Sequence, residues 1–287
     1  GMSMHFSPEY FIITIMNGNY KIFWGEMHTH TCYGHTRVKL SLQDTIRIAQ
    51  ETLDFWAPAE HGDYILIHGG MSEKEARKPS LIPKGKDSPT WKEIQEVVRN
   101  GYKPGKFVTF LGYEWEGKRN FYGDHNVYYF YDDELIYLPE EIPELYRLLK
   151  NKKAMVIPHH TGYKVHYIGK DWNYHDPKLT PFTEIYSCHG SSEADTGPRP
   201  MYFNQSMTPR TSGGTARDAL ARGYHLGFIA SSDNHDGYPG SWNQGLVAVL
   251  AEELTRESLW DAFQNRRVYA VTGDRILIDF RVDEHMM

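Results

Sequence analysis

Histidine is the residue type with the clearest chemical potential in this sequence, because 15 of the 287 residues are histidines. Two pairs of candidate ligands are spaced two residues apart, His28 with His30 and Asp233 with His235. On an extended chain, residues two apart point to the same side, so both members of a pair can reach one ion. Neutral imidazole together with carboxylate suits Zn²⁺, Mn²⁺ or Fe²⁺ better than Ca²⁺ or Mg²⁺. The spacing therefore predicts a site for transition-metal ions.

Further histidines and one glutamate stand at the ends of short apolar runs. They are His35, His61, Glu114, His125, His159, His160 and His189. Together with the two pairs they exceed the number of ligands that one tetrahedral ion can use, so we expect two or three ions. Glu114 is the candidate bridge between ions, because a carboxylate has two oxygens to share. The other histidines, His175 among them, lack this placement, and we interpret them as structural or surface residues.

Four neighbours of these candidates have two interpretations each. Cys32 is either a soft metal ligand or a small buried apolar residue. Asp63, Asp124 and Asp236 each adjoin a candidate ligand, and they either orient imidazole rings or belong to loops and turns. The sequence leaves both interpretations open.

The elements that must position these residues are short strands alternating with amphipathic helices, which is the pattern of an α/β fold. Strands are expected over Tyr20–Met27, Leu53–Ala59, Lys106–Gly112, Asn126–Tyr131, Ala154–Pro158, Phe182–Ser187, Leu226–Ala230, Leu246–Leu250, Val268–Val271 and Ile276–Val282. Helices are expected after the cap at Ser41 and over Trp91–Val98, Pro139–Lys150, Thr215–Arg222 and Thr255–Asn265. In a closed β/α barrel the carboxyl ends of the strands meet at one mouth, so the candidate ligands would converge there.

Two segments, His61 to Thr90 and Gly190 to Gly214, have the glycine, proline and polar content of long loops. Such loops often cover a binding site. The second loop carries Arg199 and Arg210, and Lys164 lies in a neighbouring loop. Because arginine binds phosphate through a planar fork of donors, we expect at least one of these three cations to face the metal ions and bind the substrate.

Composition excludes several classes of protein. Hydrophobic residues make up 40% and charged residues 24% of the chain, which argues against disorder. No apolar stretch approaches the roughly 18 residues of a membrane span, and no signal-peptide pattern is present, so we expect a cytoplasmic protein without a membrane partner. Two cysteines are too few for a disulfide framework. A formal net charge of −6 argues against nucleic acid as a partner.

The order of these motifs resembles that of the PHP superfamily of polymerase-associated and histidinol-phosphatase-like metallophosphoesterases. The motifs are His28-x-His30, His35, His61, Glu114, His159-His160 and Asp233-x-His235. Segments that begin at Gly112, Gly123, Ile157, Tyr186, Ala230 and Arg267 are similar to those of a less characterised branch, the DUF3604 family. The resemblance extends from Phe23 to Phe280, which is nearly the whole chain.

This resemblance implies a distorted (β/α)7 barrel with metal ions at the carboxyl ends of its strands. One domain would span residues 1–287, with an N-terminal extension over residues 1–20 and a C-terminal β segment over residues 268–283. The implied ligands are His28, His30, His61, Glu114, His125, one of His159 and His160, Asp233 and His235. His35 stands where the family more often has aspartate, and it keeps a metal role. The choice between His159 and His160 stays open.

The expected function is that of a phosphoesterase that uses these ions to activate water against a small phosphorylated substrate. Glu114, His189 and Asp233 are the candidate catalytic residues. We expect His189 to lie in the pocket, where it contacts substrate, donates a proton or orients another ligand. Two alternatives remain: an amidohydrolase-like enzyme that acts on a carbon centre, and a metal-binding module without catalysis.

Overall fold

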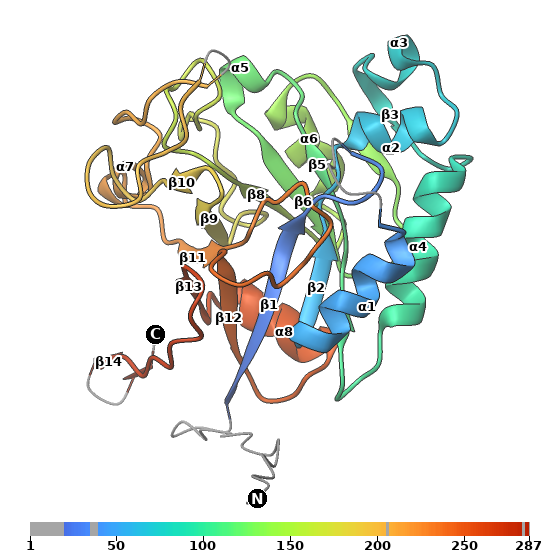
Figure 1. The fold of residues 1–287 in the computed structure, drawn as a ribbon. Coiled ribbons are helices and arrows are strands. Elements are labelled where there is room, and N and C mark those ends of the chain that lie inside the picture. The colour runs from blue at the N-terminus through green and yellow to red at the C-terminus, as the bar shows by residue number, and fades with distance from the viewer. Residues whose placement is uncertain (1–19, 35–39, 205–206, 283–284, 287) are drawn as a thin grey trace, which may run out of the picture.

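The computed structural model describes residues 20–34, 40–204, 207–282 and 285–286 (Figure 1). The expected N-terminal extension, except Tyr20, and the candidate ligand His35 lie outside these residues. The described chain has a mixed α/β fold, as the sequence predicts. No helix among the described residues is long and apolar enough to cross a membrane.

The largest sheet has five strands in the order β13-β12-β1-β2-β4. They are β13 (Val268–Val271), β12 (Leu246–Ala251), β1 (Lys21–Thr29), β2 (Phe55–Pro58) and β4 (Val108–Thr109). β1 lies parallel to β2 and antiparallel to β12. Gly25 in β1 pairs with Phe55, and a Cβ at that position would lie only 2.4 Å from the Phe55 ring. Glycine therefore lets the two strands pair while Phe55 packs across β1.

Two three-stranded sheets complete the centre of the fold. One has the order β5-β6-β8, with β5 (Leu111–Trp115), β6 (His125–Tyr129) and β8 (Ala154–Pro158). The other has the order β10-β9-β11, with β10 (Gly190–Ser191), β9 (Phe182–Ser187) and β11 (Gly227–Ala230). Two-stranded sheets are formed by β3 (Ser80–Lys84) with β7 (Ile136–Leu138), and by β14 (Arg281–Val282) with β15 (His285–Met286).

Single backbone hydrogen bonds connect the edges of the larger sheets. The Glu114 amide in β5 donates to the Glu60 carbonyl after β2 at 2.8 Å, and the Asp233 amide after β11 donates to the His28 carbonyl in β1 at 2.8 Å. These bonds bring the ends of β1, β2, β5 and β11 together. The strands nevertheless belong to separate sheets within the described residues, so the expected closed seven-stranded barrel is not confirmed.

The antiparallel direction of β6 explains one feature of the sequence. His125 opens its strand, whereas most of the other candidates close theirs. In the register of this sheet His125 pairs with Trp115 at the end of β5 and with Pro158 at the end of β8. The start of β6 therefore lies at the same edge as the carboxyl ends of its neighbours.

Helices cover the outside of the sheets (Figure 1). The longer ones are α1 (Leu42–Thr52), α4 (Pro89–Gly101), α6 (Ile142–Leu149) and α8 (Arg256–Gln264), and the shorter ones are α2 (Gly62–His68), α3 (Glu73–Ala76), α5 (Arg119–Tyr122) and α7 (Ala216–Ala221). Ser41 caps α1 as expected, because its side chain accepts a hydrogen bond from the Asp44 amide. Thr215 and Asp218 form a complete capping box at α7.

Three expectations about elements need correction. The segment from His61 to Thr90 is not one long loop, because it contains α2, α3 and β3. The run around Ile65 and Leu66 forms a helix there because both side chains are fully buried. The single strand expected over Lys106–Gly112 is divided into β4 and β5, and only Arg281–Val282 of the expected strand Ile276–Val282 is extended. Between Gly190 and Gly214, the described residues form a loop after the short β10.

Candidate metal centre

The two histidines of β1 are held in matching ways at the carboxyl end of the strand. Both are buried, and each Nδ1 contacts a buried carboxylate: His28 contacts Glu184 at 3.0 Å and His30 contacts Glu60 at 3.2 Å. Their Nε2 atoms both face Oδ1 of Asp233, at 3.4 Å and 3.2 Å. A carboxylate on Nδ1 fixes the ring orientation and leaves Nε2 to bind an ion, which is the usual environment of a histidine ligand.

Glu114 and Asp233 are each shared by histidines from different strand ends. Glu114 lies 3.1 Å from Nε2 of His159 through Oε1 and 2.9 Å from Nδ1 of His61 through Oε2. Asp233 faces the β1 histidines through Oδ1 and Nε2 of His189 through Oδ2, the latter at 3.2 Å. Because each carboxylate offers different oxygens to different histidines, both residues are placed to connect adjacent ions.

Several buried atoms at this centre have no hydrogen-bond partner among the described residues. They include His28 Nε2, Glu114 Oε2, His125 Nε2, His159 Nε2 and Asp233 Oδ2. A buried polar atom without a partner costs about 1–3 kcal/mol, so a cluster of them is rare unless something else binds there. Imidazole nitrogens and carboxylate oxygens that face one another across a short gap are the donors that a divalent cation needs. The residues therefore fit a metal ion.

The pKa shifts of the buried residues show that the cluster favours bound positive charge. Burial by itself would lower the pKa of His28, but the carboxylates of Asp233 and Glu184 raise it to about 10. Burial would raise the pKa of Glu114 and of Asp233, but the neighbouring histidines hold both well below the ordinary range. Protonated histidines thus supply the positive charge that a bound cation would otherwise supply.

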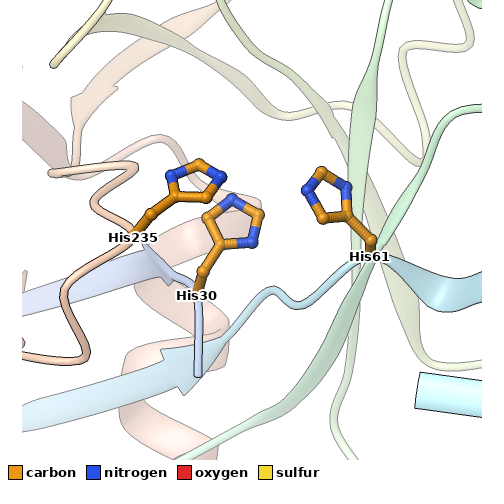
Figure 2. Close-up of side chains that lie close together, drawn as sticks. All are labelled: His30, His61 and His235. Atoms are coloured by element: carbon orange, nitrogen blue, oxygen red, sulfur yellow. The ribbon is translucent and has the colours of Figure 1, made fainter. Parts of the chain in front are cut away.

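A second group faces the first across the centre. Figure 2 shows His30 and His235 side by side, with His61 opposite them. The rings of His30 and His235 are stacked with centroids 3.9 Å apart, and those of His30 and His61 are 4.5 Å apart. Burial, together with the charge of His30, lowers the pKa of His235 to about 4, so its imidazole is neutral. Ligand atoms of these three histidines lie close enough together to hold one ion.

Backbone strain coincides with the cluster. Asp233 has φ 51° and His160 has φ 35°, both in the left-handed region that residues other than glycine rarely adopt. Such strain concentrates at functional sites, where surrounding contacts hold the backbone in place.

The two adjacent histidines after β8 have different surroundings. The His159 ring lies near that of His28, with centroids 4.4 Å apart, and its Nε2 faces Glu114. The Nε2 of His160 instead faces Asp124 at 3.3 Å. Asp124 also accepts from Nε of Arg119 at 3.1 Å, so it connects His160 to the wall of the cavity.

His125 lies among apolar and basic neighbours. Its Nδ1 is 3.1 Å from the Gly123 carbonyl, and its ring lies against Trp115. Burial, followed by the charge of Lys170, holds the pKa of His125 well below its usual value, so the ring is neutral. Neutral imidazole with Nδ1 bound to a carbonyl leaves Nε2 available as a ligand.

His189 lies at the centre, as expected from its position after β9. It lines the cavity, its Nε2 faces Asp233, and its Nδ1 is 2.9 Å from the Tyr163 hydroxyl. The thiol of the neighbouring Cys188 donates a hydrogen bond to the Asp233 carbonyl, with Sγ 3.2 Å from the oxygen. Asp63, one of the residues with two interpretations, binds Arg77 at 3.0 Å on the cavity wall. The amide of Asp236, another of them, donates to Asn234 in the loop after β11.

The centre opens into a cavity of about 580 Å³. Besides the histidines it is lined by Tyr64, Arg77, Glu116, Arg119, Leu138 and Met207, among others. The cationic side chains expected at the site lie elsewhere: Lys164 is exposed, Arg199 packs on Tyr186, and Arg210 donates to the Ser191 and Gly197 carbonyls. Among the described residues that line the cavity, the basic ones of the lysine and arginine type are Arg77 and Arg119.

Sequence reasoning did not single out Glu60, Glu184, Arg77 or Arg119. The signal for Glu60 was present, because it directly precedes His61 at the end of β2. Glu184 lies within β9, where an acidic residue in a strand expected to be buried was itself a sign of a buried partner. Arg77 follows a short helix in a segment that was expected to be a loop, and Arg119 begins a short helix where no element was expected. The sequence therefore gave no indication that either side chain lines the cavity.

Comparison with known proteins supports the fold. Residues 241–284 match a family described as a protein of unknown function, DUF3604. This segment begins after Asp233 and His235, so the match does not include the cluster. An uncharacterized protein of Chlamydia pneumoniae is 29% identical over 210 residues, which cover 67% of this chain and 33% of that protein. The chain thus spans about a third of the length of this curated relative.

Among solved structures, the chain is similar to a two-domain protein from Bacteroides vulgatus that contains a predicted PHP-like metal-dependent phosphoesterase. The TM-score is 0.55 with 14% identity, over 89% of this chain and 66% of that one. At this identity the similarity shows a shared fold. The mixed α/β fold thus has a PHP-like neighbour, and the His, Asp and Glu cluster in it could bind a divalent metal ion.

The expectation that nucleic acid is not a partner does not stand. The similar structures include endonuclease Q in complex with a 27-mer duplex substrate that has an abasic lesion, with a TM-score of 0.48 and 14% identity, over 85% of this chain and 57% of that one. A net charge of −6 describes the whole surface and says little about one cavity, where Arg77 and Arg119 lie. Net charge therefore does not exclude nucleic acid.

Proposed function

We propose that this chain is a metal-dependent phosphoesterase whose centre holds two or three divalent transition-metal ions. The observation that carries the proposal is the sharing of two buried carboxylates, Glu114 and Asp233, among histidines that end different strands. A bound divalent metal supplies a Lewis acid and lowers the pKa of a coordinated water. We also propose that the three larger sheets together make the distorted barrel that the resemblance implies.

The proposed ligands are residues whose ring nitrogens or carboxylate oxygens face the centre. They are His28, His30, His61, Glu114, His159, His189, Asp233 and His235. His125 is kept as a further candidate because its Nε2 is buried without a hydrogen bond. His160 is proposed to hold Asp124 rather than an ion, because its Nε2 faces that carboxylate. His35 stays a prediction from the sequence.

The proposed substrate is a phosphate ester, which is favoured by the two guanidinium groups in the cavity. Arg119 forms ion pairs with Asp124 and Glu116, and Arg77 forms ion pairs with Asp63 and Glu73. These partners hold the guanidinium groups in place, and each group keeps further N–H donors for phosphate oxygens. Hydrolysis at a carbon centre would not need such cations outside the ligand set.

The test combines metal analysis with a substrate panel. Elemental analysis of the purified protein is expected to give at least two transition-metal ions per chain. Purified protein with Mn²⁺, Zn²⁺ or Fe²⁺ is then assayed against phosphomonoesters, phosphodiesters, oligonucleotides, amides and lactones. We expect hydrolysis of at least one phosphate ester, and loss of that activity in Glu114→Gln. His175→Gln is the control, because His175 is a partly buried histidine away from the cavity lining.

Three outcomes would contradict the proposal. Protein without bound metal would remove the centre itself. Hydrolysis of amides or lactones without phosphate esters would favour the carbon-centre alternative. Bound metal without hydrolysis of any substrate would favour a metal-binding module.

A further inference from the structure

The hydroxyl of Tyr163 joins His189 to the loop that follows β10. Tyr163 follows the His159-His160 motif and is fully buried. Its hydroxyl lies 2.9 Å from Nδ1 of His189 and 2.7 Å from the backbone carbonyl of Tyr202. The Tyr202 amide in turn donates to the His189 carbonyl at 2.6 Å. Three hydrogen bonds thus close a triangle between these residues.

The chemistry of the partners fixes the direction of each bond. A carbonyl only accepts, so the single phenol proton must be donated to Tyr202. The hydroxyl oxygen can then only accept from His189, which requires a proton on Nδ1. With Nδ1 protonated, Nε2 is the ring nitrogen that can offer a lone pair to a metal ion, and it faces the Asp233 carboxylate at 3.2 Å. A metal ion bound between this nitrogen and the carboxylate would satisfy both groups.

We infer that Tyr163 is a positioning residue, which holds His189 in the tautomer that binds metal through Nε2 and links this ligand to the loop over residues 192–204. The inference rests on the proposed function, because it assigns a role toward the same metal centre. Glu184 and Glu60 contact Nδ1 of the two β1 histidines and orient their rings. Tyr163 does the same at Nδ1 of His189, with a neutral group in place of a carboxylate.

Packing explains why the loop is part of the arrangement. Tyr163 packs with Ile168 and Met201 in a small apolar cluster, and Met207 packs against it. Met201 is buried next to Tyr202, and Met207 also lines the cavity. The loop is therefore fixed to Tyr163 at the point where it passes the centre, so a change in the loop can reach the imidazole of His189 through the Tyr163 hydroxyl.

The experiment measures Zn²⁺ affinity by competition with a chromophoric chelator, so it needs no substrate. Tyr163→Phe keeps the ring and removes only the hydroxyl. We expect it to weaken Zn²⁺ binding roughly 10- to 100-fold, as loss of a group that orients a ligand typically does. Tyr129→Phe is the matched control, because Tyr129 is also fully buried and its hydroxyl also donates to a backbone carbonyl, that of Leu135 at 2.8 Å. It should bind Zn²⁺ like the wild type.

A double-mutant cycle separates action through His189 from a general structural effect. We expect His189→Ala to weaken Zn²⁺ binding, and we expect Tyr163→Phe to add less than about two-fold in that background. An equal effect of Tyr163→Phe with and without His189 would overturn the inference, as would wild-type affinity in folded Tyr163→Phe. Wild-type protein that binds no Zn²⁺ would overturn the proposed function as well, so the two failures are distinguishable.

A measurement on the wild type covers the case in which Tyr163→Phe does not fold. Ring nitrogens of histidine are observed by ¹⁵N NMR in Zn²⁺-loaded protein, with His189 assigned by comparison with His189→Ala. We expect a proton on Nδ1 and metal on Nε2. The opposite assignment, or a ring with protons on both nitrogens, would overturn the inference.

Discussion

The site has two halves, the buried metal centre and the mouth of the cavity, and they are built from different residues. The inner half consists of His28, Glu184, His159 and Asp233, whose side chains are almost completely buried, between 0% and 3% exposed. The outer half consists of Arg77, Glu116 and Arg119 with Asp63, and its charged groups reach 49% exposure. The inner carboxylates, Glu184 and Asp233, contact histidines. The outer carboxylates, Asp63 and Glu116, contact guanidinium groups, and Glu116 also lies 3.1 Å from Nδ1 of His61.

This difference indicates that the two halves have separate roles in the proposed function. Buried carboxylates paired with neutral or protonated imidazole leave room for a cation, because a metal can replace the protons. Guanidinium groups that already have carboxylate partners at the surface do not need a cation, and water or a ligand can reach them. Changes in the inner half should therefore alter metal binding, and changes in the outer half should alter substrate binding.

The largest effect is expected from the inner carboxylate that three histidines share. Asp233→Asn keeps the shape of the side chain but removes its negative charge. We expect it to lower Zn²⁺ affinity by roughly 100-fold or more and to abolish turnover, because the group contacts the ions directly. Zn²⁺ competition titration and activity assays measure both. Asp236→Asn is the matched control in the same loop, and equal losses in the two variants would contradict the comparison.

A smaller effect on the same half is expected from the residue that orients His28. Glu184→Gln keeps a side-chain oxygen that can accept a hydrogen bond from Nδ1 of His28, but it removes the negative charge beside this ring. We expect Zn²⁺ affinity to fall roughly 10- to 100-fold, with thermal unfolding little changed. Metal titration and circular dichroism melting measure the two quantities. Glu193→Gln, an exposed site beyond β10, serves as the control. Unchanged affinity in Glu184→Gln would show that His28 does not depend on this carboxylate.

The outer half should respond in substrate binding alone. Arg119→Lys keeps the charge but loses the fork of donors, so we expect KM for a phosphate ester to rise about tenfold while Zn²⁺ affinity stays at the wild-type value. Steady-state kinetics and metal titration separate the two. Arg199→Ala, Arg210→Ala and Lys164→Ala should change KM less, because these residues lie outside the cavity lining. A larger effect on KM in any of these three variants would show that the loop cations, and not Arg119, contact the substrate.

Much of the inner half could be predicted from the sequence, and what could not be predicted has a physical reason. The strands Ala154–Pro158 and Phe182–Ser187 were predicted with their observed bounds. The first is a continuous apolar run, which is typical of a buried strand. The ligands that end them follow from the geometry of strand ends. Glu184 could not be assigned a partner, because its contact with His28 joins residues 156 positions apart.

The outer half was not predictable in the same way. Arg77 directly follows α3 and Arg119 begins α5, and each of these helices has four residues. Helices this short have no periodicity that a sequence pattern can reveal. The loop cations Arg199 and Arg210 had the expected chemistry and position in the chain, but hydrogen bonds to Tyr186, Ser191 and Gly197 direct them elsewhere.

The smallest effect is expected in the pH dependence of stability, and it too distinguishes the halves. The pKa of His28 in the metal-free fold is about 10, above its ordinary value of 6.5, because Asp233 and Glu184 outweigh the opposing effect of burial. The folded chain therefore binds a proton that the unfolded chain releases. This contribution to the free energy of unfolding is fully present below about pH 6.5 and is lost as the pH rises through 10.

We therefore expect the Tm of metal-free protein to fall by several degrees between pH 7 and pH 10, because the folded chain loses this proton over that range. Zn²⁺-loaded protein should lose less over the same range, because the metal takes the place of the proton on the inner histidines. Differential scanning fluorimetry across buffers measures both curves, and His28→Gln should flatten the metal-free one. If Zn²⁺ leaves the pH dependence unchanged, the protons and the metal do not compete, and the inner half is not the place where the ion binds.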